Sequence, residues 1–278
     1  MMRRLLLFVL LLLMIACRNE NPKAYEAEVQ QWRVQRRARL TREDSWLTLV
    51  GLFWLHEGVN DITLPTHPPA RKHFVLGNGQ VTLQPNIILR DDTNPKGPTI
   101  IRDGSVSFEV IKRGDVGGDR FGIRVKDTQS EARKNFKGLD YFPPNPAFRI
   151  QAQFQPYNPP KKIPIANVLG MTSDETAPGA LVFTLGGKTY RIDPILEQGE
   201  KDLFIIFKDA TSGKETYGAA RYVYAHPPDA SGNTIVDFNK SYNPPCVFTP
   251  YATCPLPPPQ NRLPIRIEAG EKKYAGHV

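Results

Sequence analysis

Residues 237–262 read DFNKSYNPPCVFTPYATCPLPPPQNR, and the rest of the chain is organised around this stretch. Its prolines exclude a helix and a central strand, because proline fixes its own φ and has no N–H to donate. Large apolar side chains interleave with the prolines, which is unusual for a disordered segment; they are Phe238, Tyr242, Val247, Phe248, Tyr251 and Leu256. The stretch therefore predicts an ordered, stiff coil packed over a β core.

Motifs in and around this stretch resemble the DUF1684 family of bacterial and archaeal proteins. They are Asp-Phe-Asn-x-x-Tyr-Asn-Pro-Pro-Cys at 237–246, the Cys-Pro-Leu-Pro-Pro and Asn-Arg-Leu-Pro segments within 254–264, and Ala-Gly-Glu at 269–271. Trp46-Leu47, residues 51–55, and the Asp-x-Thr-Ser-Gly and Thr-Tyr-Gly segments within 209–218 extend the resemblance. The family has no established activity, so the resemblance implies no substrate or reaction.

The first 17 residues have the pattern of a lipoprotein signal. Arg3 and Arg4 precede an apolar run from Leu5 to Ala16, which is too short to span a bilayer but suits a signal peptide. The run ends in Met-Ile-Ala-Cys, similar to a lipobox whose cysteine, Cys17, is lipidated. We expect a signal peptide over 1–16, a lipid tether over 17–22 and attachment to a membrane of the cell envelope. An ordinary signal peptide with a chance cysteine is the alternative.

The chain carries a net charge of +8 at pH 7, and several arginines follow the expected anchor closely. Arg33, Arg36, Arg37, Arg39 and Arg42 lie in or just after a predicted helix, which favours an anionic membrane surface as a partner. A nucleic-acid partner is not expected, because the compartment is wrong and no recognition motif is present. The oligomeric state is left open.

The remaining chain predicts one mainly β domain over 23–278. A helix is expected over 23–40, where Tyr25, Val29, Trp32 and Leu40 share a stripe that Arg36 interrupts. A capping box at Thr128-x-x-Glu131 predicts a second, short helix towards Phe136. Residues 45–55 are apolar on nearly every side and should be buried. No linker, repeat or charge block divides the chain.

Short strands with turn signals between them predict an antiparallel barrel or a two-sheet sandwich. Asn78-Gly79, Asp103-Gly104 and Gly186-Gly187 supply the positive φ that tight hairpins need. Residues 148–154 alternate apolar and polar side chains, as a strand with one wet face does. Further strands are expected at 203–207, 221–225, 234–238 and 263–268. Sites in such folds lie on loops or at a barrel mouth.

Several familiar chemistries lack their motifs. No serine lies in Gly-x-Ser-x-Gly or Ser-x-x-Lys, and no His-x-x-x-His pair is present, so neither those serine nucleophiles nor a helix-borne zinc site is supported. The glycine-rich run 114–122 does not open a helix after a parallel strand and is expected to be a turn. No metal and no cofactor is predicted. His226 is a candidate base or ligand, or else a plain loop histidine.

The polar residues around the proline-rich stretch form the candidate site. Asp237, Glu268, Glu271 and His226 are candidate catalytic groups, and the candidate binding residues are Arg221, Asn239, Tyr242, Asn243, Asn261, Arg262, Asp209 and Ser212. One hypothesis is an envelope hydrolase or transferase, with two unlike acids as acid and base and arginines holding an anion. The other is a tethered module that binds a small molecule or glycan, or serves a structural role, where these residues form a buried network. A cluster sealed by Tyr242 and Phe248 would favour the second.

Cys246 and Cys254 are the two cysteines left after Cys17. Their even number and the oxidising compartment predict a disulfide between them. A zinc site is a weaker alternative, because two further ligands are not near in sequence, and a catalytic thiol is weaker still.

Overall fold

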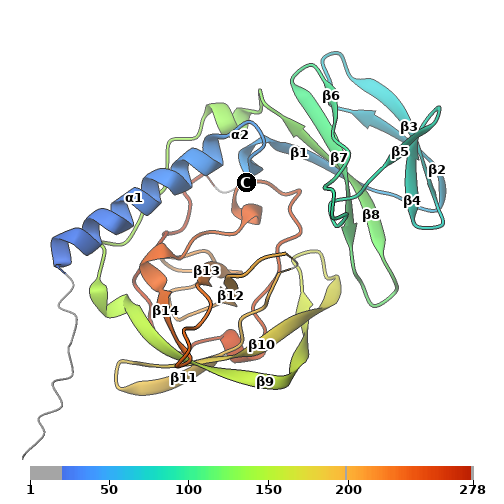
Figure 1. The fold of residues 1–278 in the computed structure, drawn as a ribbon. Helices are drawn as coiled ribbons and strands as arrows, with labels where there is room; N and C mark the ends of the chain where they lie inside the picture. Colours follow the sequence, from blue (N-terminus) through green and yellow to red (C-terminus); the bar gives the residue numbers. More distant parts are fainter. Residues whose placement is uncertain (1–20, 198, 277–278) are drawn as a thin grey trace, which may run out of the picture.

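The computed structural model of the chain describes residues 21–197 and 199–276 (Figure 1). The predicted signal peptide, the lipidation site at Cys17 and most of the predicted tether lie outside these residues. Among the helices of the described part, none is long and apolar enough to span a bilayer.

Helix α1 (Pro22–Thr41) confirms the helix predicted at the start of the domain. Asn21 caps it, because the Asn21 Oδ1 accepts a hydrogen bond from the Lys23 N–H at 3.0 Å. Its buried stripe contains Tyr25, Val29 and Leu40 as expected, and also Arg36. The helix therefore docks on the protein through a stripe that includes a charged side chain.

Two four-stranded antiparallel sheets follow and form the first β group. One sheet has the order β1-β8-β7-β6, and the other has the order β2-β3-β4-β5. The strands are β1 (Leu49–Trp54), β2 (Gly58–Leu64), β3 (Ala70–Gly77), β4 (Gln80–Leu83), β5 (Ile87–Leu89), β6 (Ile101–Asp103), β7 (Val106–Arg113) and β8 (Arg120–Asp127). The sheets share one core, in which the rings of Phe74 and Phe108 meet edge to face at 5.7 Å.

The second β group contains the proline-rich stretch. A sheet of order β11-β10-β9-β14 faces the two-stranded sheet β12-β13. The strands are β9 (Arg149–Ala166), β10 (Thr172–Leu185), β11 (Lys188–Ile192), β12 (Leu203–Phe207), β13 (Arg221–Ala225) and β14 (Asn233–Asp237). Phe238 lies between the sheets, with ring centroids 5.9 Å from Phe183 and 5.1 Å from Phe207. Phe238 is fully buried and ties the proline-rich stretch to this core.

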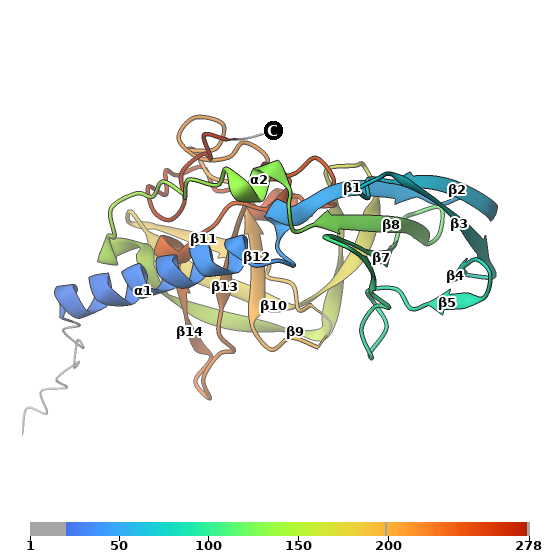
Figure 2. The ribbon, with the colours of Figure 1, turned by 90° about the horizontal axis from the view of Figure 1, so that it is seen from above.

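Seen from above, α1 lies along the second β group, and the first β group lies beyond the C-terminal end of α1 (Figure 2). The short connection Trp46–Thr48 joins α1 to β1. The proline-rich stretch is an ordered coil with three short 3-10 turns, Phe238–Lys240, Pro245–Val247 and Pro259–Asn261. The mainly β, antiparallel, sandwich-like architecture confirms the predicted fold class. The single-domain organisation stays a prediction.

The tight turns are confirmed in detail at two hairpins. Asn78 (φ 52°) and Gly79 (φ 70°) connect β3 to β4, and Gly186 (φ 59°) and Gly187 (φ 74°) connect β10 to β11. Positive φ at both central residues gives the turn the twist of the strands that it joins.

Three sequence expectations need correction. The short helix is α2 (Glu131–Lys134), and it is capped by Ser130, not Thr128. Residues 263–268 are not a strand, because the chain there is held by an isolated bridge between Lys208 and Arg262 and by side chains. Residues 45–55 were expected to be buried throughout, but Trp46, Val50 and residues 52–55 are only partly buried, because β1 packs one face on the first core.

Candidate functional site

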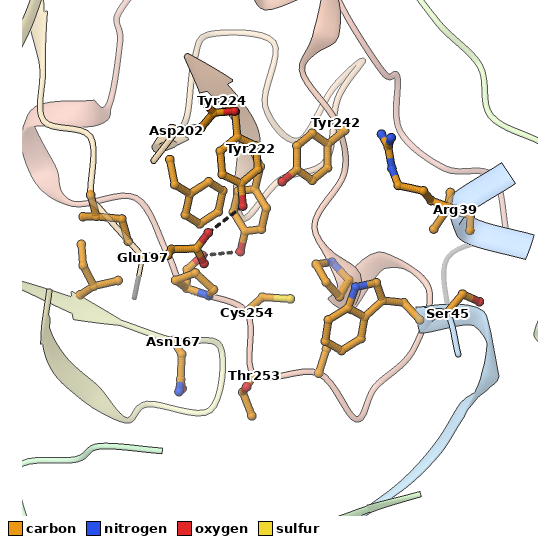
Figure 3. Close-up of a pocket in the computed structure, with 18 of the residues that line it drawn as sticks. Arg39, Ser45, Asn167, Glu197, Asp202, Tyr222, Tyr224, Tyr242, Thr253 and Cys254 are labelled. Carbon is orange, nitrogen blue, oxygen red and sulfur yellow. Dashed lines mark hydrogen bonds between the residues drawn. The ribbon is translucent and has the colours of Figure 1, made fainter. Parts of the chain in front are cut away.

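A pocket of about 960 Å³ lies where α1 and the two β groups meet (Figure 3). Its walls come from the C-terminal half of α1, the turn at Trp46, strands β7 and β8, strands β12 and β13, and the proline-rich stretch. The volume is typical of pockets that bind small molecules. The two sides of the pocket differ in chemistry.

An aromatic wall covers the side formed by the second β group. Phe204 and Tyr224 are direct cross-strand partners on β12 and β13, and their rings stack at 4.8 Å and 24°. Tyr242, from the proline-rich stretch, continues the wall almost parallel to Tyr224, at 6.3 Å and 12°. Tyr224 is 40% exposed, so part of its ring is accessible.

Glu197 lies beside this wall (Figure 3). The Tyr224 hydroxyl donates a hydrogen bond of 2.7 Å to Glu197 Oε2. Burial raises the pKa of the Glu197 carboxyl above its ordinary value of 4.5; the Tyr224 hydrogen bond opposes this, and the charges of Glu200 and Glu175 add to it. The pocket thus holds a carboxyl group with an increased tendency to keep its proton.

Arginines line the opposite side of the pocket. Arg39 and Arg42 come from the end of α1, and Arg113 and Arg124 come from β7 and β8, whereas Arg36 lies against the aromatic wall, 4.6 Å from the Tyr242 ring. Arg113 forms a 2.8 Å ion pair with Asp92 and donates a hydrogen bond to Thr253 at 3.0 Å. One end of the pocket is therefore basic, and the other is aromatic and acidic.

The predicted residues Asp237 and Asn239 do come together, but under α1 and not in the pocket. Asp237 Oδ1 accepts hydrogen bonds from the Tyr25 hydroxyl (2.8 Å) and the Asn239 side chain (3.2 Å). Asn239 also exchanges two hydrogen bonds of 2.8 Å with the backbone of Asn145. Asp237 is 5% exposed and Asn239 is fully buried. This network fastens α1 to the end of β14.

Glu271 and Asn243 form a second buried network, again with α1. Arg36 Nε donates to Glu271 Oε1 at 2.8 Å, and the Asn243 N–H donates to Glu271 Oε2 at 2.7 Å. The Arg36 guanidinium lies over the rings of Tyr242 (4.6 Å) and Phe248 (5.9 Å). The two rings cover this ion pair, which is the arrangement expected of a structural network.

Arg221 and Asp209 form a third network in the interior. Arg221 Nη1 lies 3.3 Å from Asp209 Oδ1, and Arg221 also donates to the carbonyls of Ile267 and Ala269. Burial lowers the pKa of Arg221, and the charge of Asp209 opposes that shift. Ser212 belongs to the Asp209 turn, whose backbone it hydrogen-bonds at 3.2 Å. These groups hold the coil at 267–269.

The other predicted residues are dispersed. Asn261 is buried and hydrogen-bonds Asp193 through the backbone N–H and C=O of that residue. Arg262 and Glu268 are exposed, and Glu268 pairs with Arg266 on the surface. His226 lies at the rim of the pocket with a 90% exposed side chain and is 3.0 Å from Asp202. Of the predicted catalytic and binding residues, Tyr242 and His226 line the pocket, and so does Cys254, one of the two predicted disulfide cysteines.

The predicted disulfide is absent from the structure, in which Cys246 and Cys254 are free thiols. Cys254 Sγ accepts a hydrogen bond from the Cys246 N–H at 3.0 Å, and the Cys246 thiol lies 3.6 Å from the Tyr217 hydroxyl. The hydrogen bond with Cys254 lowers the pKa of Cys246, and burial raises that of Cys254. Within the described part of the chain, no group of three metal-ligating side chains is arranged to hold an ion.

A family model described as "Protein of unknown function (DUF1684)" matches residues 134–272, half of the chain. The chain belongs to this family. No curated protein matches it. The solution NMR structure of an uncharacterized protein from Haloarcula marismortui is similar, with 29% identity, a TM-score of 0.44, and coverage of 52% of this chain and 81% of that chain.

The DUF1684 region supplies one side of the pocket. Phe204, Tyr224, Tyr242 and Glu197 lie within 134–272, whereas all the arginines of the pocket precede it. The three buried networks also lie mainly in this region, with Tyr25 and Arg36 reaching in from α1. The family motifs thus correspond chiefly to residues that hold the proline-rich stretch in place.

Sequence reasoning missed Glu197, Tyr224, Trp46 and Arg124 as pocket residues. Successive side chains of a strand point to opposite faces, so the alternation along 221–225 could have predicted that Tyr224 lies on the accessible face of β13 when Val223 lies on the buried face. No local signal marks Glu197 or Arg124, because the pocket forms only when segments far apart in sequence meet.

Proposed function

We propose that this DUF1684 protein is a binding module of the cell envelope that holds a small, ring-bearing polar molecule, such as a glycan unit, in the pocket beside α1. The observation that carries the proposal is the stacked wall of Phe204, Tyr224 and Tyr242 in a pocket of about 960 Å³. Pockets that bind small molecules combine apolar, aromatic walls with a few placed polar groups.

The polar groups near the wall suit a ligand rich in hydroxyl groups. The Glu197 carboxyl offers acceptor oxygens to ligand hydroxyl groups, and burial, which raises its pKa, disfavours its charged form. The Tyr224 hydroxyl, whose hydrogen is donated to Glu197, adds a further acceptor site. A ring that stacks on Tyr224 would thus have hydrogen-bonding partners at its edge.

Binding is favoured over hydrolysis or group transfer at the proline-rich stretch. A general acid or base must lie within hydrogen-bonding reach of the substrate, and glycoside hydrolysis uses two such carboxyl groups. Asp237 is 5% exposed and Glu271 is 1% exposed, and both are engaged in the structural networks with α1 and do not line the pocket. The envelope hydrolase or transferase therefore has less support than the binding module.

Attachment to a membrane through a lipidated Cys17 is part of the proposal. It rests on the sequence of the first 17 residues, with two arginines, an apolar run and a cysteine after a small residue. The position of the anchor close to α1 would keep the pocket near the membrane surface.

The test compares Tyr224→Ala with Tyr251→Ala in a screen of glycans and metabolites, with binding measured by thermal shift and calorimetry. Tyr251 is a matched control, because it is 36% exposed and does not line the pocket. We expect ligands of the wild type to be retained by Tyr251→Ala and to bind at least about 10-fold more weakly to Tyr224→Ala, the effect of losing roughly 1.4 kcal/mol.

Tyr224→Phe separates stacking from hydrogen bonding, because it keeps the ring and removes the donor to Glu197. We expect an intermediate affinity. Equal binding by wild type and Tyr224→Ala, with both fully folded, would contradict the proposed site.

A further inference from the structure

Arg124 is the least satisfied charged group on the wall of the pocket. Its side chain extends from β8 and the residue is 5% exposed. Its Nε and Nη2 atoms are buried, and neither has a hydrogen-bond partner among the described residues. A buried donor without a partner carries a desolvation cost that folding does not recover.

The acids near Arg124 do not compensate its charge well. Arg124 Nη1 is 3.7 Å from Glu109 and 4.0 Å from Asp92, beyond hydrogen-bonding distance. Both acids have other cations, since Asp92 pairs with Arg113 at 2.8 Å and Glu109 lies 3.6 Å from Lys126. Burial, followed by repulsion from Arg113, lowers the pKa of Arg124. The local charge balance is thus positive.

The free edge of Arg124 has the geometry of an anion receptor. Nε and Nη2 of a guanidinium form a fork that matches the two oxygens of a carboxylate or phosphate. The Arg124 guanidinium carbon lies over the Trp46 ring, 5.1 Å from its centroid, and both side chains line the pocket. Trp46 is partly exposed and lies in a 3-10 turn, so it is the neighbouring side chain that would have to shift for an anion to reach the buried edge.

We infer that the ligand of this pocket carries a carboxylate or phosphate group, which pairs with the Nε and Nη2 atoms of Arg124 when the Trp46 indole shifts. The inference rests on the proposed function and adds the chemical class of the ligand. The basic side holds the anionic group while the aromatic wall, across the pocket, holds the ring.

The experiment titrates the protein with sodium phosphate and sodium acetate, each against chloride at matched ionic strength, and follows melting temperature and tryptophan fluorescence. The variants are Arg124→Gln and Arg120→Gln. Arg120 is a matched control, because it lies on the same strand, carries the same charge, and stacks on Trp54 at 4.6 Å outside the pocket.

We expect phosphate, acetate or both to stabilise the wild type and Arg120→Gln and to change their fluorescence in a saturable way. In Arg124→Gln the apparent affinity should fall about 10-fold or more, the usual effect of losing a charge-assisted hydrogen-bond pair. Its melting temperature without ligand should equal or exceed that of the wild type, because an uncompensated buried charge is removed.

Two outcomes would overturn the inference. One is no response of the wild type to either anion, and the other is the same response in both variants. Neither outcome bears on stacking at Tyr224, which the ring-bearing ligands test separately, so a failure of the inference is distinguishable from a failure of the proposed function.

Discussion

Arg36 shows at the scale of one residue why the sequence misled. Its spacing with Tyr25, Val29 and Leu40 placed it on the buried stripe of α1, yet its charge made it look like an interruption. Its partner, Glu271, is 235 residues away in sequence, so no local pattern links the two. Glu271, predicted as a possible catalytic acid, instead neutralises Arg36 and accepts the Asn243 N–H.

We predict that Glu271→Gln destabilises the protein by about 3 to 5 kcal/mol, because it leaves Arg36 buried without a counter-charge. Glu268→Gln is the matched control. Its carboxylate is 51% exposed and forms a surface pair with Arg266, so the loss should stay below about 1 kcal/mol. Urea denaturation at pH 7 measures both. Similar stability of the two variants would contradict the structural role of Glu271.

At the scale of elements, the sequence predicted strands best where the local pattern and the final environment agree. Residues 203–207 and 221–225 were predicted with the bounds of β12 and β13, because both are apolar runs that are paired in a core. Strand β9 was predicted only at its start, since from residue 156 onward it contains prolines at 156, 159, 160 and 164. Beyond residue 156, β9 pairs with β10 on one edge only, since β14 pairs with residues 149–153. An edge strand tolerates proline, because the missing N–H can face away from the partner strand.

The Ala-Gly-Glu motif at 269–271 has a clear backbone explanation. Gly270 adopts φ +77°, and a Cβ there would lie 2.5 Å from the Ser241 carbonyl oxygen and 2.9 Å from that of Phe238. The close approach lets the Glu271 N–H donate to Ser241 O at 2.8 Å, which positions the Glu271 carboxylate below Asn243. Only glycine fits this crossing of the coil and the proline-rich stretch.

We therefore predict that Gly270→Ala costs about 3 kcal/mol or more, from a strained φ and a clash with rigid backbone. Gly97→Ala separates these two effects. Gly97 has φ +73° in a surface turn, and none of the described atoms lies within 4 Å of its added Cβ, so about 1 kcal/mol is expected there. Chemical denaturation of both variants gives the comparison. Equal losses would show that the close contact at Gly270 relaxes without cost.

At the scale of the whole molecule, the pocket is the feature that the sequence predicted least. Its basic side comes from residues 39–124 and its aromatic side from residues 197–242, so it exists only through the packing of α1 and the two β groups. Sequence patterns predicted the elements on each side and the order of the proline-rich stretch. They could not predict which faces meet, because that depends on long-range contacts such as Tyr25 with Asp237 and Arg36 with Glu271.

The final prediction concerns how this molecule is held in the cell. Four residues lie between Cys17 and the start of α1 at Pro22, and the five steps of extended chain that join them span at most about 18 Å. A lipid on Cys17 would thus keep the basic helix within reach of an anionic membrane surface, where lipid and charge together give stable attachment. A wash in 1 M salt screens the attraction between the basic helix and the membrane, because the Debye length is then about 3 Å. We expect the wild type to remain with membranes after this wash and Cys17→Ser to be released. The Cys17→Ser protein should also lack a lipid-modified N-terminus by mass spectrometry. If both proteins stay on the membrane after the wash, or if the wild type carries no lipid, attachment does not depend on Cys17 and the anchoring proposal is wrong.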